Sequence, residues 1–142
     1  MGTYALVHFG VREGNMAVQL NHLIVMACNQ TESAKFFSEI LGLPAATRFG
    51  PFLVVQTAND VSLDFDEAEG DVTPLHYAFL ITEGEFDEIF ARIRAHGIDY
   101  WADPGRTRLG EINHHDGGRG VYFRDPSGHL LEIITRPYGS GP

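Results

Sequence analysis

The stretches Leu20-Asn21-His22-Leu23-Ile24-Val25 and Pro74-Leu75-His76-Tyr77-Ala78-Phe79 decide the fold, because they carry one pattern at two places in the chain. Each is an apolar strand with a histidine near its start, followed by a polar break and a helix. Each helix ends at a glycine: Gly42 comes 20 residues after His22, and Gly97 comes 21 residues after His76. The sequence therefore predicts two matched half-domains that each present one histidine from the same strand position.

Hydrophobic spacing predicts the element order β-α-β-β-β in both halves, and hence an α+β fold. For the first half the expected elements are a strand over 18–26, a helix over 31–42 capped by Asn29 or Thr31, and strands over 52–57 and 61–65. For the second half they are a strand over 75–81, a helix running from a capping box at Thr82–Glu85 to Gly97, and strands near 99–102, 108–112, 120–124 and 129–135.

These patterns divide the chain into an extension and one two-module domain. Residues 1–17 have no clear period, and we assign them no role. Module one covers about 18–66, module two covers about 74–136, and the acidic residues 66–73 read as a solvated linker between them within a single domain 18–142.

Composition excludes several classes of function. The chain has 142 residues, of which 44% are apolar, and a formal net charge of −9, so nucleic acids and anionic membranes would repel it. A single cysteine excludes an intrachain disulfide and a cysteine zinc site. No apolar run is long enough to span a membrane, and no signal peptide is visible, so we expect a cytoplasmic protein.

Glu132 is the strongest candidate for a third functional group beside the two histidines. It stands alone in the apolar run Leu130-Leu131-Glu132-Ile133-Ile134, and a buried carboxylate needs a partner. Arg124 on the neighbouring strand is one candidate partner; a metal ion held jointly with His22 and His76 is the other. Two histidines and one carboxylate with open positions suit Fe(II), and also accept Mn(II), Zn(II) or Ni(II).

The two histidine strands, together with Asp125-Pro126-Ser127-Gly128 followed by Glu132, resemble the vicinal oxygen chelate superfamily of glyoxalases, extradiol dioxygenases, fosfomycin-resistance thiol transferases and bleomycin-resistance proteins. The resemblance covers 18–136. It implies paired βαβββ modules whose curved mixed sheets surround a metal-binding groove. It also implies that His22, His76 and Glu132 hold one divalent metal ion, with Fe(II) or Mn(II) favoured and Zn or Ni as alternatives.

Two departures narrow the choice within that superfamily. Glyoxalase I enzymes add a glutamate ligand from the last strand of the first module, where Ser62 matches here and Asp64 is the nearest carboxylate. The fosfomycin enzymes carry a threonine two residues after the first histidine, where this chain has Ile24. These departures weaken the interpretations as a glyoxalase I and as a fosfomycin-resistance enzyme, and an extradiol-dioxygenase-like enzyme is slightly favoured.

Further candidates for catalysis lie close to the closing motif. Tyr122 matches a tyrosine of the dioxygenases and thiol transferases, although it could equally pack in the core. His114 and His115 stand in a glycine-rich loop, either as acid–base groups or as solvated residues. Arg119 could bind an anionic substrate or cap that loop. His129 follows a turn glycine and alternates away from Glu132, so we expect it to be exposed.

We therefore expect a metal-dependent enzyme that acts on a small molecule chelated through two adjacent oxygens. The alternatives are a thiol transferase, lyase or isomerase of the same superfamily, or a small-molecule binding protein of the bleomycin-resistance type. The open sheet edges predict a homodimer, with Arg136-Pro137-Tyr138 near its interface. We expect neither nucleic acid nor a membrane among the partners.

Overall fold

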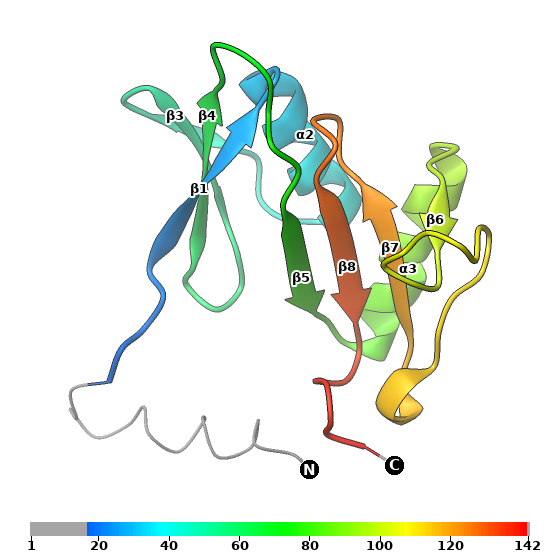
Figure 1. The fold of residues 1–142 in the computed structure, drawn as a ribbon. Helices are drawn as coiled ribbons and strands as arrows, with labels where there is room; N and C mark the ends of the chain where they lie inside the picture. The colour runs from blue at the N-terminus through cyan, green and yellow to red at the C-terminus, as the bar shows by residue number, and fades with distance from the viewer. Residues whose placement is uncertain (1–16, 142) are drawn as a thin grey trace.

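A computed structural model describes residues 17–141, and it has the expected α+β architecture of two βαβββ modules (Figure 1). The elements of module one are β1 (His22–Ala27), α2 (Gln30–Leu41), β2 (Thr47–Phe49), β3 (Phe52–Gln56) and β4 (Ser62–Glu67). Those of module two are β5 (His76–Leu80), α3 (Glu83–Ala95), β6 (Tyr100–Trp101), β7 (Gly120–Arg124) and β8 (Leu130–Ile134), with a 3-10 turn at His115–Gly117 before β7.

Each module forms its own mixed sheet, and the two sheets have equivalent strand orders. The orders are β1-β4-β3-β2 and β5-β8-β7-β6. In both sheets the first strand runs parallel to the last strand of its module, and the remaining pairs are antiparallel. The strands β1 and β5 therefore each lie at an edge of their sheet.

Local sequence signals start and end the two helices. The Asn29 side chain accepts a hydrogen bond from the Glu32 backbone N–H at the start of α2, and Gly42 ends that helix in the left-handed conformation (φ 71°). The expected capping box at the start of α3 is present, with Thr82 and Glu85 each bonded to the other's backbone. No helix within residues 17–141 combines the length and the apolar character needed to cross a bilayer.

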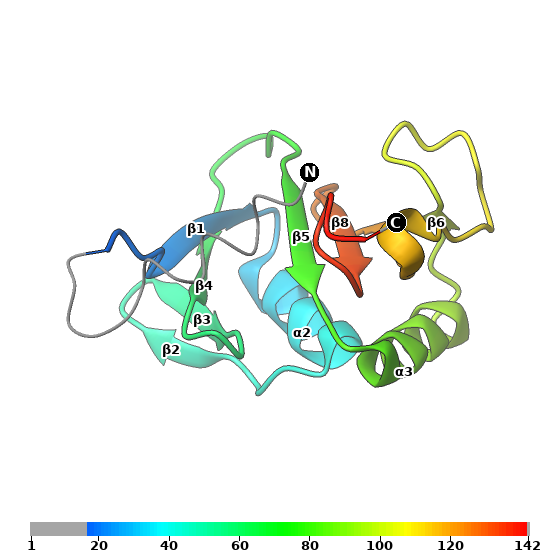
Figure 2. The same ribbon diagram turned by 90° about the horizontal axis from the view of Figure 1, so that it is seen from below.

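The hydrophobic core lies between the helices and one face of each sheet. Figure 2 shows α2 and α3 side by side on the same side of the molecule. Alternation along the strands directs every second residue toward them. Fully buried members of this core are Val25, Phe37, Val55, Phe65, Phe86, Ile93, Val121, Phe123, Leu131 and Ile133. The opposite faces of the strands carry His22, His76 and Glu132.

The short strands differ in part from the expected ones. The strand expected over 61–65 forms as β4, Ser62–Glu67, with Leu63 and Phe65 buried on alternate positions. Residues 108–112 form no strand; Leu109 makes only an isolated bridge to Trp101. The short strand β2 completes the expected β-α-β-β-β order of module one, but its position was not assigned, because three exposed residues carry no detectable alternation.

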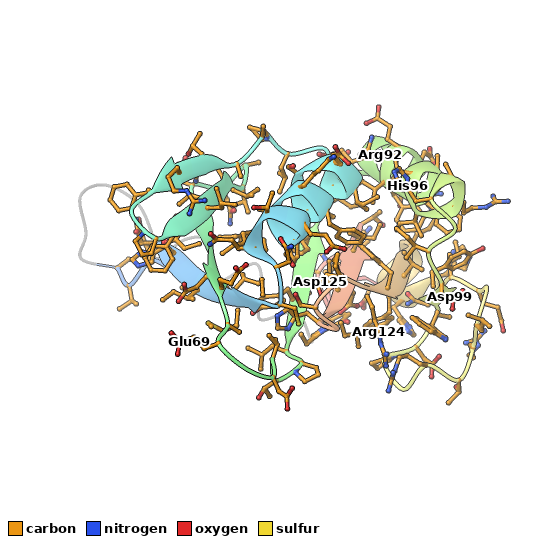
Figure 3. All side chains as sticks on the ribbon, turned by 90° about the horizontal axis from the view of Figure 1, so that it is seen from above. Glu69, Arg92, His96, Asp99, Arg124 and Asp125 are labelled. Atoms are coloured by element: carbon orange, nitrogen blue, oxygen red, sulfur yellow. The ribbon has the colours of Figure 1, made fainter. Side chains whose placement is uncertain are left out.

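His129 and the turn before it join the two modules, so the expectation that His129 is exposed was wrong. Its Nδ1 accepts a hydrogen bond from the Leu75 N–H (2.9 Å), and its Nε2 therefore donates to the Met26 carbonyl of β1 (2.7 Å). In the same turn, the Ser127 hydroxyl accepts from the Cys28 N–H (3.0 Å). Figure 3 labels Asp125, where this turn begins, close to the strands of both modules.

Candidate metal centre

Glu132 occupies the middle of β8, on the sheet face that points away from the helices. Its neighbours across the strands are Ala78 of β5 and Tyr122 of β7. Ala78 is exposed on this face, yet Glu132 has no accessible surface at all. One of its oxygens, Oε1, lies 3.0 Å from Nε2 of His76. The carboxylate is thus buried and already beside one of the predicted metal ligands.

The tautomer of His76 can be read from its second nitrogen. Nδ1 lies 2.9 Å from the carbonyl oxygen of Leu130, which can only accept a hydrogen bond, so Nδ1 carries the proton. In the neutral imidazole, Nε2 then presents a lone pair to the Glu132 carboxylate. Two electron-pair donors 3.0 Å apart repel each other unless a proton or a cation lies between them. A backbone carbonyl that orients a histidine in this way is the usual outer partner of a metal-binding imidazole.

His22 also has a hydrogen-bond acceptor at its Nδ1, but it lies on the other sheet. Its Nδ1 is 2.8 Å from the side-chain oxygen of Asn21, which leaves Nε2 free to bind a metal. Within residues 17–141, however, the structure brings no three His, Cys, Asp or Glu side chains within reach of one ion. A single chain thus unites His76 with Glu132 and holds His22 apart from them.

The strand registers identify the module-one counterpart of Glu132. In module two, Glu132 pairs with Ala78, two residues after His76; in module one, Asp64 pairs with Ile24, two residues after His22. Asp64, and not Ser62, is therefore the module-one counterpart of Glu132. One Asp64 oxygen is buried without a hydrogen-bond partner within the described residues. Both modules consequently place a histidine and a carboxylate on the same face, which fits a divalent cation.

Two tyrosines complete the surroundings of Glu132. The Tyr138 hydroxyl donates to Oε2 of Glu132, and it lies 3.0 Å from the Tyr122 hydroxyl. Since the Tyr138 proton is used on the carboxylate, Tyr122 is the donor in the second bond. The Tyr122 ring also stacks on His76, with ring centroids 5.9 Å apart. Sequence reasoning found Tyr122 but assigned no site role to Tyr138; an aromatic residue between Pro137 and Gly139, six residues after Glu132, was the available signal.

Burial and the nearby carboxylate make both phenols weak acids. Burial raises the pKa of Tyr122 to about 12, and the charge of Glu132 acts in the same direction. The pKa of Tyr138 is also raised, first by burial and then by its bond to Glu132. Both hydroxyls therefore keep their protons at neutral pH and act as hydrogen-bond donors.

This raised pKa predicts a distinct alkaline titration. Phenolate formation would be followed by absorbance in the wild type and in Tyr122→Phe. The difference between the two titration curves reports Tyr122, and it should appear near pH 12 rather than near 10, the ordinary pKa of tyrosine. Because the pKa of Tyr122 is higher in the folded protein, its contribution to the free energy of unfolding is fully present below about pH 10. This contribution is lost as the pH rises through about 12. A difference between the two titration curves that appears near pH 10 would contradict the buried position of Tyr122.

The remaining predicted residues lie outside this cluster. His114 and His115 are exposed in the loop before β7, and neither side chain makes a hydrogen bond within the described residues; their acid–base role stays a prediction. Arg119 is held by Glu83 (2.7 Å) and Asp87 (2.9 Å), which favours its structural role over anion binding.

Arg124 was the other candidate partner for Glu132. It pairs in register with Leu130, and its guanidinium lies 6.0 Å from the centre of the Trp101 ring. Figure 3 labels it at the turn end of the hairpin. The contacts of the carboxylate are instead His76 and Tyr138.

Comparison with known proteins agrees with this architecture. The chain is 33% identical over 127 residues to the glutathione transferase FosA of Serratia marcescens, covering 83% of this chain and 81% of that protein. It is 31% identical over 121 residues to the metallothiol transferase FosB of Shouchella clausii (strain KSM-K16), covering 82% and 79%.

Two solved structures are more similar still. Oxidase ChaP-H2 superposes with a TM-score of 0.87 at 58% identity, covering 89% of this chain and all of that one. Oxidase ChaP-H1 superposes with a TM-score of 0.85 at 63% identity, covering 87% and 99%. The family model for the Glyoxalase/Bleomycin resistance protein/Dioxygenase superfamily matches residues 19–133. With its fold and its paired histidine strands, the chain belongs to this superfamily.

Proposed function

We propose that this protein is a divalent-metal-dependent enzyme and that His22, His76 and Glu132 hold its metal. One observation carries the proposal: the lone pair of His76 Nε2 points at a fully buried carboxylate oxygen 3.0 Å away. A cation held between them would relieve the repulsion and balance the buried charge. Because the donors are two imidazoles and one carboxylate, Fe(II) or Mn(II) is favoured, with Zn(II) or Ni(II) as alternatives.

The residues around the proposed metal would bind and orient a small substrate. The metal would supply Lewis acidity toward two adjacent substrate oxygens. His76 and Glu132 would hold the ion at the sheet face, and a substrate could approach from the solvent side, where the His76 side chain is 46% accessible. Tyr122 and Tyr138 remain protonated, so they hold the carboxylate in place and add no further negative charge.

Oxidation is the reaction that we favour. The two oxidases share 58% and 63% identity with this chain over nearly their full lengths, far more than the thiol transferases do. Extradiol ring cleavage, which the sequence slightly favoured, has no specific support among these relatives. Thiol transfer is the second candidate because both FosA and FosB are related over about four-fifths of their lengths. The exposed Ile24, in place of the threonine of the fosfomycin enzymes, weakens that candidate.

The test begins with protein purified without an affinity tag. Elemental analysis should find about one divalent metal ion per chain, the stoichiometry of a single site. Loaded with Fe(II), the protein should consume O₂ in the presence of ortho-dihydroxy aromatic compounds, whereas Glu132→Gln should not. Loss of free thiol on incubation with glutathione and fosfomycin would support thiol transfer instead. Failure to bind any of Fe(II), Mn(II), Zn(II) or Ni(II) would contradict both.

The separation of His22 from the other two ligands supports a homodimer as the functional unit. Within one chain, β1 and β5 are both sheet edges, and Ile24 and Leu80 are 48% and 61% exposed on the faces that carry the histidines. A second copy that approaches these edges would cover the apolar side chains. It would also bring His22 of one subunit to His76 and Glu132 of the other.

Mixing two inactive variants should reveal such a shared site. When His22→Ala and Glu132→Ala proteins are unfolded together and refolded, each mixed dimer would have one site with both defects and one intact site. Random pairing should therefore restore roughly a quarter of the wild-type metal content, because a two-fold dimer contains two equivalent sites. Sites contained within one chain would restore none, and a sedimentation experiment showing only monomer would also contradict the dimer.

A further inference from the structure

The C-terminal residues 136–141, which follow β8, form a hook over the candidate metal centre. Figures 1 and 2 show this segment running on from the end of β8 and ending beside the 3-10 turn His115–Gly117. Within the hook, the Ser140 N–H donates to the Pro137 carbonyl (3.1 Å), and the Arg136 guanidinium donates to the Ser140 carbonyl (3.2 Å). These contacts close a compact turn with Tyr138 at its apex.

The hook is anchored on the loop that precedes β7. The Asp116 carboxylate accepts a hydrogen bond from the Gly139 N–H (3.1 Å). Gly139 has φ 74°, which an ordinary residue rarely adopts. At Gly118, a Cβ atom would lie 2.5 Å from the Arg136 side chain. Glycines at these two positions therefore allow the close approach that seats the hook.

The hook also explains an anomaly in burial. Glu132 lies on a sheet face where Ala78 and Leu80 are exposed, yet it is completely buried. Tyr138 covers its outer side and donates a hydrogen bond to Oε2. The other oxygen, Oε1, remains directed at His76 Nε2. Tyr138 thus fixes which carboxylate oxygen faces the imidazole.

We propose that Tyr138 is a positioning residue of the metal centre and that the hook is a built part of this site. The inference rests on the proposed function, since it assumes that His76 and Glu132 bind a metal. By holding Oε2, Tyr138 stops the carboxylate from rotating and keeps Oε1 available as a ligand. The Tyr122 hydroxyl donates a hydrogen bond to the Tyr138 hydroxyl (3.0 Å) and so helps to hold it in place. Loss of such an outer partner weakens metal binding by about 10- to 100-fold in other metalloproteins.

Cobalt binding tests this role without reference to catalysis. Wild-type protein, Tyr138→Phe and the control Tyr100→Phe would each be titrated with Co²⁺ while the visible absorption spectrum is recorded. Tyr100 is a suitable control because it is half-buried on β6 and packs against Phe90, away from Glu132. Tyr138→Phe should weaken Co²⁺ binding by about 10- to 100-fold and change the spectrum, because the carboxylate is free to reorient. Tyr100→Phe should change neither.

A second variant tests the anchor, and the outcomes separate the two proposals. Asp116→Ala keeps the phenol but releases the hook, so it should weaken Co²⁺ binding in the same direction. If the wild type binds Co²⁺ and Tyr138→Phe binds it with the same affinity and spectrum, the positioning role is overturned and the proposed function stands. If the wild type binds no Co²⁺, the proposed metal site fails, and the role of Tyr138 fails with it.

Discussion

Replacing Glu132 by glutamine should remove most of the metal from this protein and leave it folded. The amide has nearly the shape of the carboxylate, so it can still accept a hydrogen bond from Tyr138, and its NH₂ group can donate to His76 Nε2. The protein therefore loses a negative charge without losing packing. The expected loss in metal affinity exceeds about 100-fold, the upper end of what removal of an outer partner costs. Measuring the metal content tests the expected loss of metal, and the melting temperature of the metal-free protein tests whether the variant remains folded.

His22→Ala and His76→Ala should have similarly large effects on metal content. The core between the helices and sheets does not depend on either exposed imidazole, so both variants should fold. Because the three residues serve one site, their effects should not add, and the triple variant should bind little worse than any single one.

Ser62→Ala is the matched control for these ligand substitutions. Ser62 pairs directly with His22 across the strands, but the register makes Asp64 the counterpart of Glu132. Metal content should therefore remain unchanged in Ser62→Ala. If His22→Ala retains full occupancy at unchanged affinity, the two-module site is wrong, and His114 or His115 becomes the first residue to test as the third ligand.

Replacing His129 by leucine should cause the largest loss of stability among single substitutions away from the metal centre. The imidazole is fully buried and satisfies the Leu75 N–H and the Met26 carbonyl at once. Leucine fills much of the volume but leaves both backbone groups without a partner, at about 1–3 kcal/mol each. The free energy of unfolding should fall by about 3 kcal/mol, which lowers the melting temperature by roughly 10 °C for a chain of this size.

Tyr77→Phe provides a control at a residue in direct contact with His129. Tyr77 packs edge-on against His129, with ring centroids 5.3 Å apart, and its buried hydroxyl has no partner within the described residues. Removing that hydroxyl should leave stability unchanged or raise it. If His129→Leu lowers the free energy of unfolding by less than about 1 kcal/mol, the two hydrogen bonds do not hold the modules together as described.

The repeated pattern in the sequence was sufficient to predict the modules. Alternation along the strands and the hydrophobic spacing of the helices are local properties that each segment carries by itself. The Thr82–Glu85 capping box and the glycine stops at Gly42 and Gly97 are local as well, and the structure has all of them. A lone carboxylate in an apolar strand pointed to Glu132 for the same reason, since its burial follows from its neighbours.

Tertiary structure decided the rest. Alternation placed His129 opposite Glu132 correctly, but only the packing of one module on the other makes that opposite face an interior. Strand register made Asp64, rather than Ser62, equivalent to Glu132, and register depends on pairing between distant segments. The contact of Tyr138 with Glu132 requires the chain to turn back after its last strand. Local sequence patterns determined most of the elements and which residues of each element share a face. Contacts between segments far apart in the chain determined which polar groups meet, because the energy of such contacts depends on packing that no single segment encodes.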